Sequence, residues 1–304
     1  MSGISRRSLI QSASMAAGVP ALGAVPLSRV AAQAPGSDAI EVEQDVLFGK
    51  GGDMELRLDV YHPAAANAKR VAIIHLHGGG FARGSKAGVE IPARAFAEQG
   101  YVSIASAYRL TGQARWPAPI EDTKAAIRWT RAHADRLSID ADKIAVAGYS
   151  AGGLLALFAA GTGDRPEFEG NGGTVGVSSR VAACIAVYPA VTASRGLMPE
   201  GHADDEALRA AASPVSYVSA DFAPTIFVHG VADEIIPYAS SVDFFDKLNA
   251  HGVKADLHLF QGATHAFVTR NGDAAQATAQ LANLFLDRVV VNPKAYPPFA
   301  AGGA

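Results

Sequence analysis

Short apolar runs that alternate with helix-forming stretches are the feature that most restricts the fold of this 304-residue sequence. Seven runs have the apolar pattern of strands, and they lie at residues 54–60, 71–76, 101–107, 143–147, 181–187, 224–228 and 255–260. Five stretches between or after them have helical spacing, at residues 87–99, 120–136, 151–160, 238–250 and 273–290. Because strands that alternate with helices form a mostly parallel sheet covered on both faces, we expect an α/β fold.

The composition is that of a chain with one large hydrophobic core. Hydrophobic residues make up 49% of the sequence and charged residues 18%, which excludes a disordered chain, a collagen and a coiled coil. The formal net charge of -3 gives no bulk positive field to attract nucleic acid, so we expect no nucleic-acid partner. The only cysteine, Cys184, excludes an intrachain disulfide and a zinc site built from cysteines.

The N-terminal 32 residues have the pattern of an export signal. Arg6 and Arg7 precede a weakly apolar stretch, and small residues at 30–32 suit a signal peptidase; together they resemble a bacterial twin-arginine signal. The apolar stretch is too short and interrupted for stable membrane insertion. We therefore expect export to the periplasm or the medium, with cleavage near residue 32 or 34. Residues 33–304 then form a single domain with a loose tail from about residue 292.

A possible nucleophile lies in the sequence Gly148-Tyr149-Ser150-Ala151-Gly152. This G-x-S-x-G pattern follows an apolar run and precedes an Ala- and Leu-rich helical stretch, which is the context of a nucleophile on a sharp strand-to-helix turn. Such a turn leaves no room for side chains at Gly148 and Gly152. It also points the Ala151 amide, at the helix N-terminus, toward charge that develops on a bound substrate. The pattern predicts a nucleophilic serine at position 150.

The second glycine-rich motif, His77-Gly78-Gly79-Gly80, follows the apolar run at 71–76. Consecutive glycines let the main chain approach a ligand and direct its amides inward, as in the HGGG-type loops that supply oxyanion donors. We expect donors from Gly79 and Gly80 beside Ala151, with Gly78 completing the loop and His77 bracing it. His75 and His77 share a strand face, but no third metal ligand is recognisable, so no metal site is expected.

A nucleophilic serine needs a base, and the base needs an acid that orients it. Two acids, Asp233 and Glu234, follow the apolar run at 224–228, and His265 follows the run at 255–260. Side chains at the carboxyl ends of parallel strands collect at one edge of the sheet. The chain order serine, acid, histidine is the order used by hydrolases with a G-x-S-x-G turn. His265 is therefore the predicted base, and the spacing alone leaves both acids open.

These motifs together resemble the α/β-hydrolase superfamily, over residues 56–286. Within it the chain is similar to hormone-sensitive-lipase-like esterases and to exported acetyl and feruloyl esterases. The resemblance implies an α/β-hydrolase fold with Ser150 as nucleophile, Asp233 as acid and His265 as base, because H-G-x-x-D before an apolar-Pro pair matches the family pattern. Tyr149 replaces the aspartate usual in hormone-sensitive-lipase-like members, which favours the acetyl and feruloyl branch. Residues 190–222 leave room for a small cap at most.

The activity implied by this resemblance is hydrolysis of short-acyl or aryl esters, of acetyl or feruloyl type, without a metal or organic cofactor. The substrate is expected to be a small ester or an ester linked to a polysaccharide. An arylformamidase-like amidase, which uses the same triad, is the alternative. The sequence leaves the natural substrate, the preference for ester or amide and the oligomeric state open.

Overall fold

The computed structural model describes residues 39–295 of the chain. The expected export signal at 1–32 and all of the expected tail after residue 295 lie outside the described residues, and both stay predictions. Among the helices of residues 39–295, none has the length and apolar character needed to cross a membrane.

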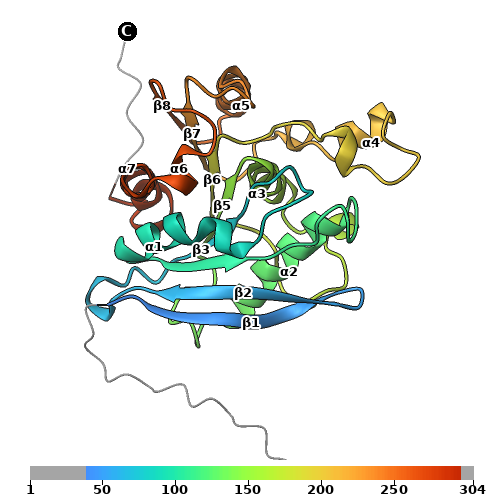
Figure 1. Ribbon diagram of the computed structural model, residues 1–304. Helices are drawn as coiled ribbons and strands as arrows, with labels where there is room; N and C mark the ends of the chain where they lie inside the picture. The colour runs from blue at the N-terminus through green and yellow to red at the C-terminus, as the bar shows by residue number, and fades with distance from the viewer. Residues whose placement is uncertain (1–38, 296–304) are drawn as a thin grey trace, which may run out of the picture. The chain divides into compact units, whose positions relative to one another are not determined.

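The described residues are organised around one eight-stranded sheet with the order β1-β2-β4-β3-β5-β6-β7-β8 (Figure 1). The strands are β1 Glu41–Gly51, β2 Met54–His62, β3 Ala72–Leu76, β4 Val102–Ser106, β5 Ile144–Tyr149, β6 Ala183–Val187, β7 Thr225–Gly230 and β8 Ala255–Phe260. Strand β2 pairs antiparallel with both β1 and β4, and every pairing from β4 to β8 is parallel. The chain therefore has the predicted mostly parallel sheet of an α/β fold.

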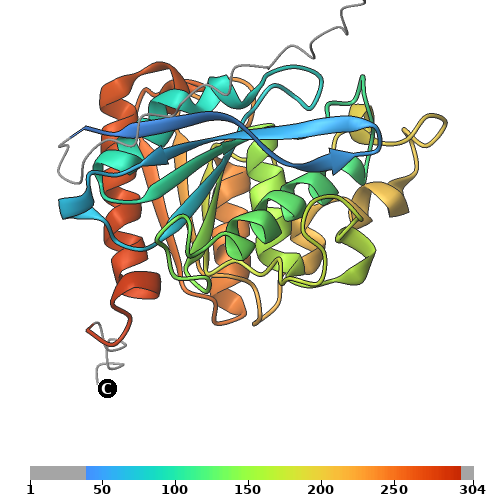
Figure 2. The same ribbon diagram turned by 90° about the horizontal axis from the view of Figure 1, so that it is seen from below.

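Helices cover both faces of the sheet (Figures 1 and 2). They are α1 Glu90–Glu98, α2 Ala118–Ala132, α3 Ala151–Thr162, α4 Glu206–Ala211, α5 Ala239–Ala250, α6 Phe267–Arg270 and α7 Gly272–Leu286. Apolar residues of α2, α3 and α5 form one core with the sheet, and those of α1, α6 and α7 form a second core on the other face. Burial on both faces explains why β3, β5, β6 and β7 read as continuous apolar runs.

Two parts of the fold differ from the sequence expectation, and a third agrees with it. Strand β1 was not expected, because its sequence is largely polar and one of its faces is exposed. It forms a hairpin with β2 through a turn that contains Gly52, whose φ is 61°. The last helix ends as an α-helix at Leu286 and continues as one π turn, Asp287–Val291. Residues 190–222 contain only the six-residue helix α4 and two short 3-10 turns, which agrees with a small insertion.

His75 occupies the centre of this sheet as a fully buried titratable group. Its Nδ1 lies 3.1 Å from the Tyr149 hydroxyl, its ring packs edge-on against Phe96, and its Nε2 has no hydrogen-bond partner in residues 39–295. Burial lowers the pKa of His75 to about 3, because a charged imidazole is unfavourable in apolar surroundings. His75 is therefore neutral in the folded protein near pH 7.

Neutral His75 makes the folded protein sensitive to acid. Its pKa is lower when folded than when unfolded, where it is about 6.5, so the unfolded chain binds more protons between these values and stability falls as pH falls. We expect the free energy of unfolding of the wild type to drop between pH 7 and pH 5 by about 2 kcal/mol more than that of His75→Phe. Denaturant titrations at both pH values measure this difference. Equal losses in the two proteins would contradict it, since every other histidine is common to both.

Candidate active site

Ser150 lies on a strained turn between β5 and α3. Its φ of 58° and ψ of -116° are rarely adopted by residues other than glycine. A Cβ atom on Gly148 would lie 2.1 Å from the Gly152 carbonyl oxygen, and one on Gly152 would lie 2.1 Å from the Leu76 oxygen. The turn therefore requires glycine at both positions, and it lifts the Ser150 hydroxyl above the edge of the sheet.

The structure brings Ser150, His265 and Asp233 together from the loops after β5, β8 and β7. The Ser150 Oγ lies 2.9 Å from His265 Nε2, and His265 Nδ1 lies 2.7 Å from Asp233 Oδ2. In this arrangement the serine hydroxyl donates to Nε2 while Nδ1–H donates to the carboxylate. The hydrogen bond to Asp233 fixes the tautomer in which Nε2 is free to accept a proton.

The Asp233 carboxylate is fully buried but well supplied with donors. Its Oδ1 accepts hydrogen bonds from the N–H groups of Ile235 and Ile236, at 2.9 and 2.8 Å. Burial by itself raises the pKa of Asp233, but these hydrogen bonds and the one from His265 outweigh it and hold the pKa below its usual value. Asp233 is therefore ionised at neutral pH.

His229 packs beside this acid, as part of the same turn. Its Nε2 donates to the Ile236 carbonyl oxygen at 3.0 Å and lies 3.3 Å from Asp233 Oδ2, while its Nδ1 meets the Ser241 hydroxyl at 2.8 Å. Burial lowers the pKa of His229, so this imidazole is neutral. His229 therefore fixes the 230–236 loop that carries Asp233.

The other acid left open by the spacing, Glu234, contacts the histidine differently. Its Oε2 accepts a hydrogen bond from the main-chain N–H of His265 at 3.3 Å, and the imidazole Nδ1 is already taken by Asp233. Glu234 thus holds the His265 loop, whereas Asp233 orients the ring.

The glycine loop lies against Ser150. A Cβ atom on Gly78 would lie 3.1 Å from the Ser150 Cβ, and the φ values of Gly79 and Gly80 are 118° and 63°. Within residues 39–295 the N–H groups of Gly79 and Gly80 donate no hydrogen bond, and Ala151, as the first residue of α3, has no acceptor within its helix. These three amides are thus available beside Ser150; their role as oxyanion donors stays a prediction.

His77 holds the glycine loop in place. Its Nδ1 lies 2.8 Å from the Gly78 oxygen, and its ring stacks on Tyr108 at 4.3 Å between centroids. The Tyr108 hydroxyl donates to the His77 oxygen at 2.7 Å. Burial lowers the pKa of His77, so it braces the loop as a neutral ring.

Tyr188 contacts the ring of His265, and sequence reasoning did not predict this contact. It follows β6 with a φ of 36°, and its ring centroid lies 4.9 Å from that of His265. Its hydroxyl donates to Thr269 Oγ1 at 3.4 Å. Tyr188 therefore supports one side of the His265 ring. In the sequence it is only an aromatic residue at the end of an apolar run, and nothing there indicates its contact with a histidine 77 positions later.

A cavity of about 560 Å³ opens over Ser150 and His265, and we call it the triad cavity. The glycine loop and the segment after it form one part of the wall, and residues at or after the ends of β5, β6, β7 and β8 form the rest. The wall residues are His77, Gly78, Gly79, Gly80, Ala82, Arg83, Gly84, Ser85, Gly88, Tyr149, Tyr188, Ile235, Ala266, Thr269 and Arg270. Residues 190–222 contribute nothing to this wall. Within the part of the chain that the structure describes, no cluster of three or more His, Cys, Asp or Glu is arranged to hold a metal ion.

Comparison with known proteins agrees with this geometry. The sequence model of the BD-FAE family matches residues 58–248. The chain is 30% identical over 258 residues to esterase LipC of Mycobacterium tuberculosis, covering 79% of this chain and 64% of LipC. It is 29% identical over 267 residues to the probable carboxylic ester hydrolase LipM of the same organism, covering 81% of this chain and 61% of LipM. The chain thus spans about three-fifths of the length of these curated relatives.

Solved structures give the same assignment. A thermophilic esterase from Thermogutta terrifontis, Est2, superposes with a TM-score of 0.71 at 31% identity, covering 84% of this chain and 95% of Est2. A truncated carbohydrate esterase from gut microbiota shares the fold, with a TM-score of 0.68 at 24% identity and coverage of 82% and 98%. With a sheet of this order and a serine on the strand-to-helix turn, the chain belongs to the BD-FAE family and has the α/β-hydrolase fold.

Proposed function

We propose that this protein is a carboxylic ester hydrolase with Ser150 as its nucleophile. The observation that carries the proposal is the continuous hydrogen-bonded path from Asp233 through His265 to Ser150. Its esterase relatives in Mycobacterium tuberculosis and Thermogutta terrifontis support the same reaction class. A serine hydroxyl is a weak nucleophile by itself, and a neutral imidazole within hydrogen-bond reach is what activates it.

The geometry supports a two-step mechanism. The Ser150 Oγ attacks the ester carbonyl as His265 Nε2 accepts its proton, and the carboxylate of Asp233 stabilises the imidazolium that forms. The negative charge on the carbonyl oxygen is stabilised by the amides of Gly79, Gly80 and Ala151. His265 then protonates the departing alcohol. Water activated by the same histidine hydrolyses the acyl-enzyme and regenerates Ser150.

We further propose that the acyl group is short or aromatic, as in acetyl and feruloyl esters. The large apolar side chains on the wall of the triad cavity are Tyr149, Tyr188 and Ile235, and the rest of the wall is glycine, small or polar. Such a wall offers little apolar area to a long alkyl chain. Structures of the related Est2 include propionate-bound and butyrate-bound forms, which supports a short-acyl site here.

The nucleophile is tested by Ser150→Ala with paraoxon, an organophosphate that phosphorylates the related Est2. We expect the wild type to be labelled stoichiometrically and to hydrolyse p-nitrophenyl acetate, and the variant to do neither, because no other hydroxyl of residues 39–295 contacts His265 Nε2. Intact-protein mass spectrometry measures the label. Ser85→Ala, which changes the other serine on the cavity wall, is the matched control and keeps labelling. Labelling that survives in Ser150→Ala would overturn the assignment.

The acid is tested by comparing Asp233→Asn with Glu234→Gln. An asparagine at 233 no longer favours the productive tautomer of His265, so kcat on p-nitrophenyl acetate should fall by roughly 10⁴-fold. Glu234 contacts only the main chain of His265, so its change should cost less than about tenfold. Steady-state kinetics at pH 7–8 measures both. Equal losses in the two variants would mean that the orienting acid has been misassigned.

Substrate preference is tested with p-nitrophenyl esters from acetyl to dodecanoyl, with acetylated xylan and an N-formyl arylamine added. We expect kcat/KM to be highest at acetyl to butanoyl and to fall for longer chains, because the cavity wall has few apolar side chains. The formamide should be cleaved more slowly than the acetyl ester. An optimum at dodecanoyl would contradict the short-acyl proposal, and a preference for the formamide would favour an amidase.

A further inference from the structure

Two arginines stand on the wall of the triad cavity without an acid to neutralise them. Arg83 and Arg270 line the cavity, and none of the residues that line it is Asp or Glu. Both arginines are exposed, and within residues 39–295 neither guanidinium makes an ion pair or a hydrogen bond. Other exposed arginines of residues 39–295, such as Arg94 and Arg180, pair with carboxylates, whereas these two do not.

The acids on the neighbouring elements leave both arginines without an ion pair. Asp233 is held inside the triad and by main-chain amides, and Glu234 accepts from the His265 N–H. Glu90 pairs with Arg94 at 2.9 Å, and Asp45 and Asp59 pair with Lys86 at 3.0 and 2.6 Å. Asp273, in the first turn of α7, forms no ion pair within residues 39–295. No carboxylate of these residues therefore pairs with Arg83 or Arg270.

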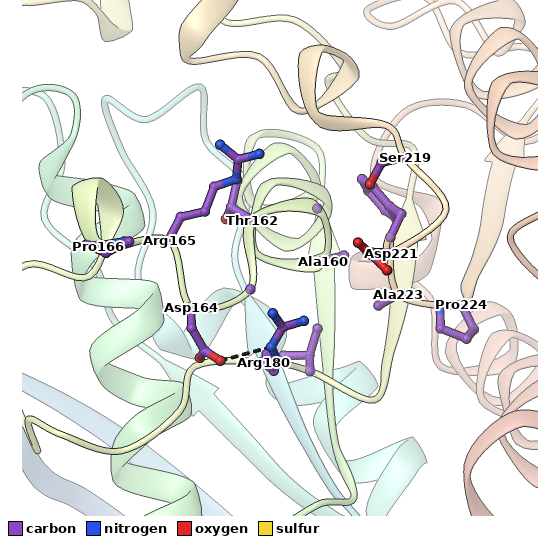
Figure 3. A pocket seen from close by; sticks show the side chains of 14 residues that line it. Ala160, Thr162, Asp164, Arg165, Pro166, Arg180, Ser219, Asp221, Ala223 and Pro224 are labelled. Carbon is purple, nitrogen blue, oxygen red and sulfur yellow. Dashed lines mark hydrogen bonds and ion pairs between the residues drawn. The ribbon is translucent and has the colours of Figure 1, made fainter. Parts of the chain in front are cut away.

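A second cavity in the same molecule shows the contrast. It has about 480 Å³ and lies at the C-terminal end of α3, with no lining residue in common with the triad cavity (Figure 3). Its two arginines, Arg165 and Arg180, are matched by two acids, Asp164 and Asp221, and Arg180 pairs with Asp164 at 2.9 Å. That cavity is balanced in charge, whereas the triad cavity carries two positive charges and no negative one.

The two arginines come from different segments of the cavity wall. Arg83 belongs to the turn after the glycine loop, where its N–H donates to the Gly79 oxygen at 3.2 Å. Arg270 ends α6, the short helix that follows His265. A group held by either side chain would occupy the same cavity as the Ser150 hydroxyl. Guanidinium groups bind carboxylates with two parallel hydrogen bonds, which makes a carboxylate the best-fitting partner.

We propose that the triad cavity selects esters that carry a carboxylate near the scissile bond, with Arg83 and Arg270 as the residues that bind it. This inference rests on the proposed ester hydrolase function. The net charge of the chain, -3, does not attract an anion, so selection depends on the local field of the cavity, where low-dielectric walls focus the two charges. The Ser85 hydroxyl on the same wall adds a neutral hydrogen-bond donor.

The experiment compares two matched pairs of esters in which only the anion is removed. The first pair places the charge on the acyl side, p-nitrophenyl hydrogen glutarate against p-nitrophenyl methyl glutarate. The second places it on the alcohol side, 4-acetoxybenzoate against methyl 4-acetoxybenzoate. For each pair the measured quantity is the ratio of kcat/KM for the anionic ester to that for the neutral ester, at low salt and at 0.5 M NaCl. Wild type, Arg83→Gln, Arg270→Gln and the double variant are compared.

In at least one pair the ratio should fall about three- to tenfold from wild type to the double variant, with intermediate values in the single variants, as expected for two solvent-exposed charge pairs. Salt should lower the wild-type ratio toward that of the double variant. The pair that responds identifies whether the acyl or the alcohol part carries the charge. Arg165→Gln, which removes an exposed arginine from the second cavity, is the control and should leave both ratios unchanged.

The result that overturns the proposal is a ratio that is the same in the wild type and the double variant for both pairs. If the neutral methyl esters are hydrolysed while the ratios stay constant, only the anion selectivity fails. If the wild type hydrolyses none of the four esters and is not labelled by paraoxon, the proposed ester hydrolase function fails, and this inference falls with it. The two failures are therefore distinguishable.

Discussion

The site depends on one close approach of main chain, where the turn around Ser150 packs on the end of β3. The Gly152 Cα lies so near the Leu76 carbonyl that a methyl group would be only 2.1 Å from its oxygen, and 2.6 Å from the oxygen of His77. This contact joins the nucleophile turn to the strand that leads into the glycine loop. Because the strained φ of Ser150 is held by both strands and by α3, the hydroxyl and the loop amides have a fixed relative position before substrate arrives.

The second constraint is electrostatic and concerns the buried carboxylate of Asp233. An ionised acid in the interior is costly unless its oxygens are hydrogen-bonded, and here two main-chain amides and His265 supply the bonds. His229 packs beside Asp233. Because burial lowers the pKa of His229, its ring is neutral and adds no second positive charge next to the carboxylate. The same loop thus keeps Asp233 ionised and aligned with the His265 ring. A main-chain scaffold suits this task because it does not titrate.

Sequence reasoning could predict the parts of this protein whose signals are local. The buried strands β3, β5, β6 and β7 are continuous apolar runs, and the turn at Gly148–Gly152 is dictated by space around Ser150. The resemblance to α/β-hydrolases favoured Asp233 over Glu234, and in the structure it is Asp233 whose carboxylate meets His265. Strand β1 was missed because its one-sided, polar pattern is weak by itself and it is stabilised by pairing with β2. The contact of Tyr188 with His265, and the places of Arg83 and Arg270 on the cavity wall, were missed because tertiary packing sets them.

The triad residues could be predicted from the sequence and the cavity arginines could not, because the two kinds of residue meet different physical requirements. A triad needs specific atoms on specific turns, and the serine turn needs glycine at fixed spacing. Short sequence motifs therefore indicate it. Charge selectivity needs only that cations reach the cavity and that acids do not, which many positions on several loops can satisfy. The overall formal charge of the chain is -3, and yet the wall around Ser150 is positive. Net charge therefore describes the chain as a whole, while the charge beside Ser150 is set by the few residues that line the cavity.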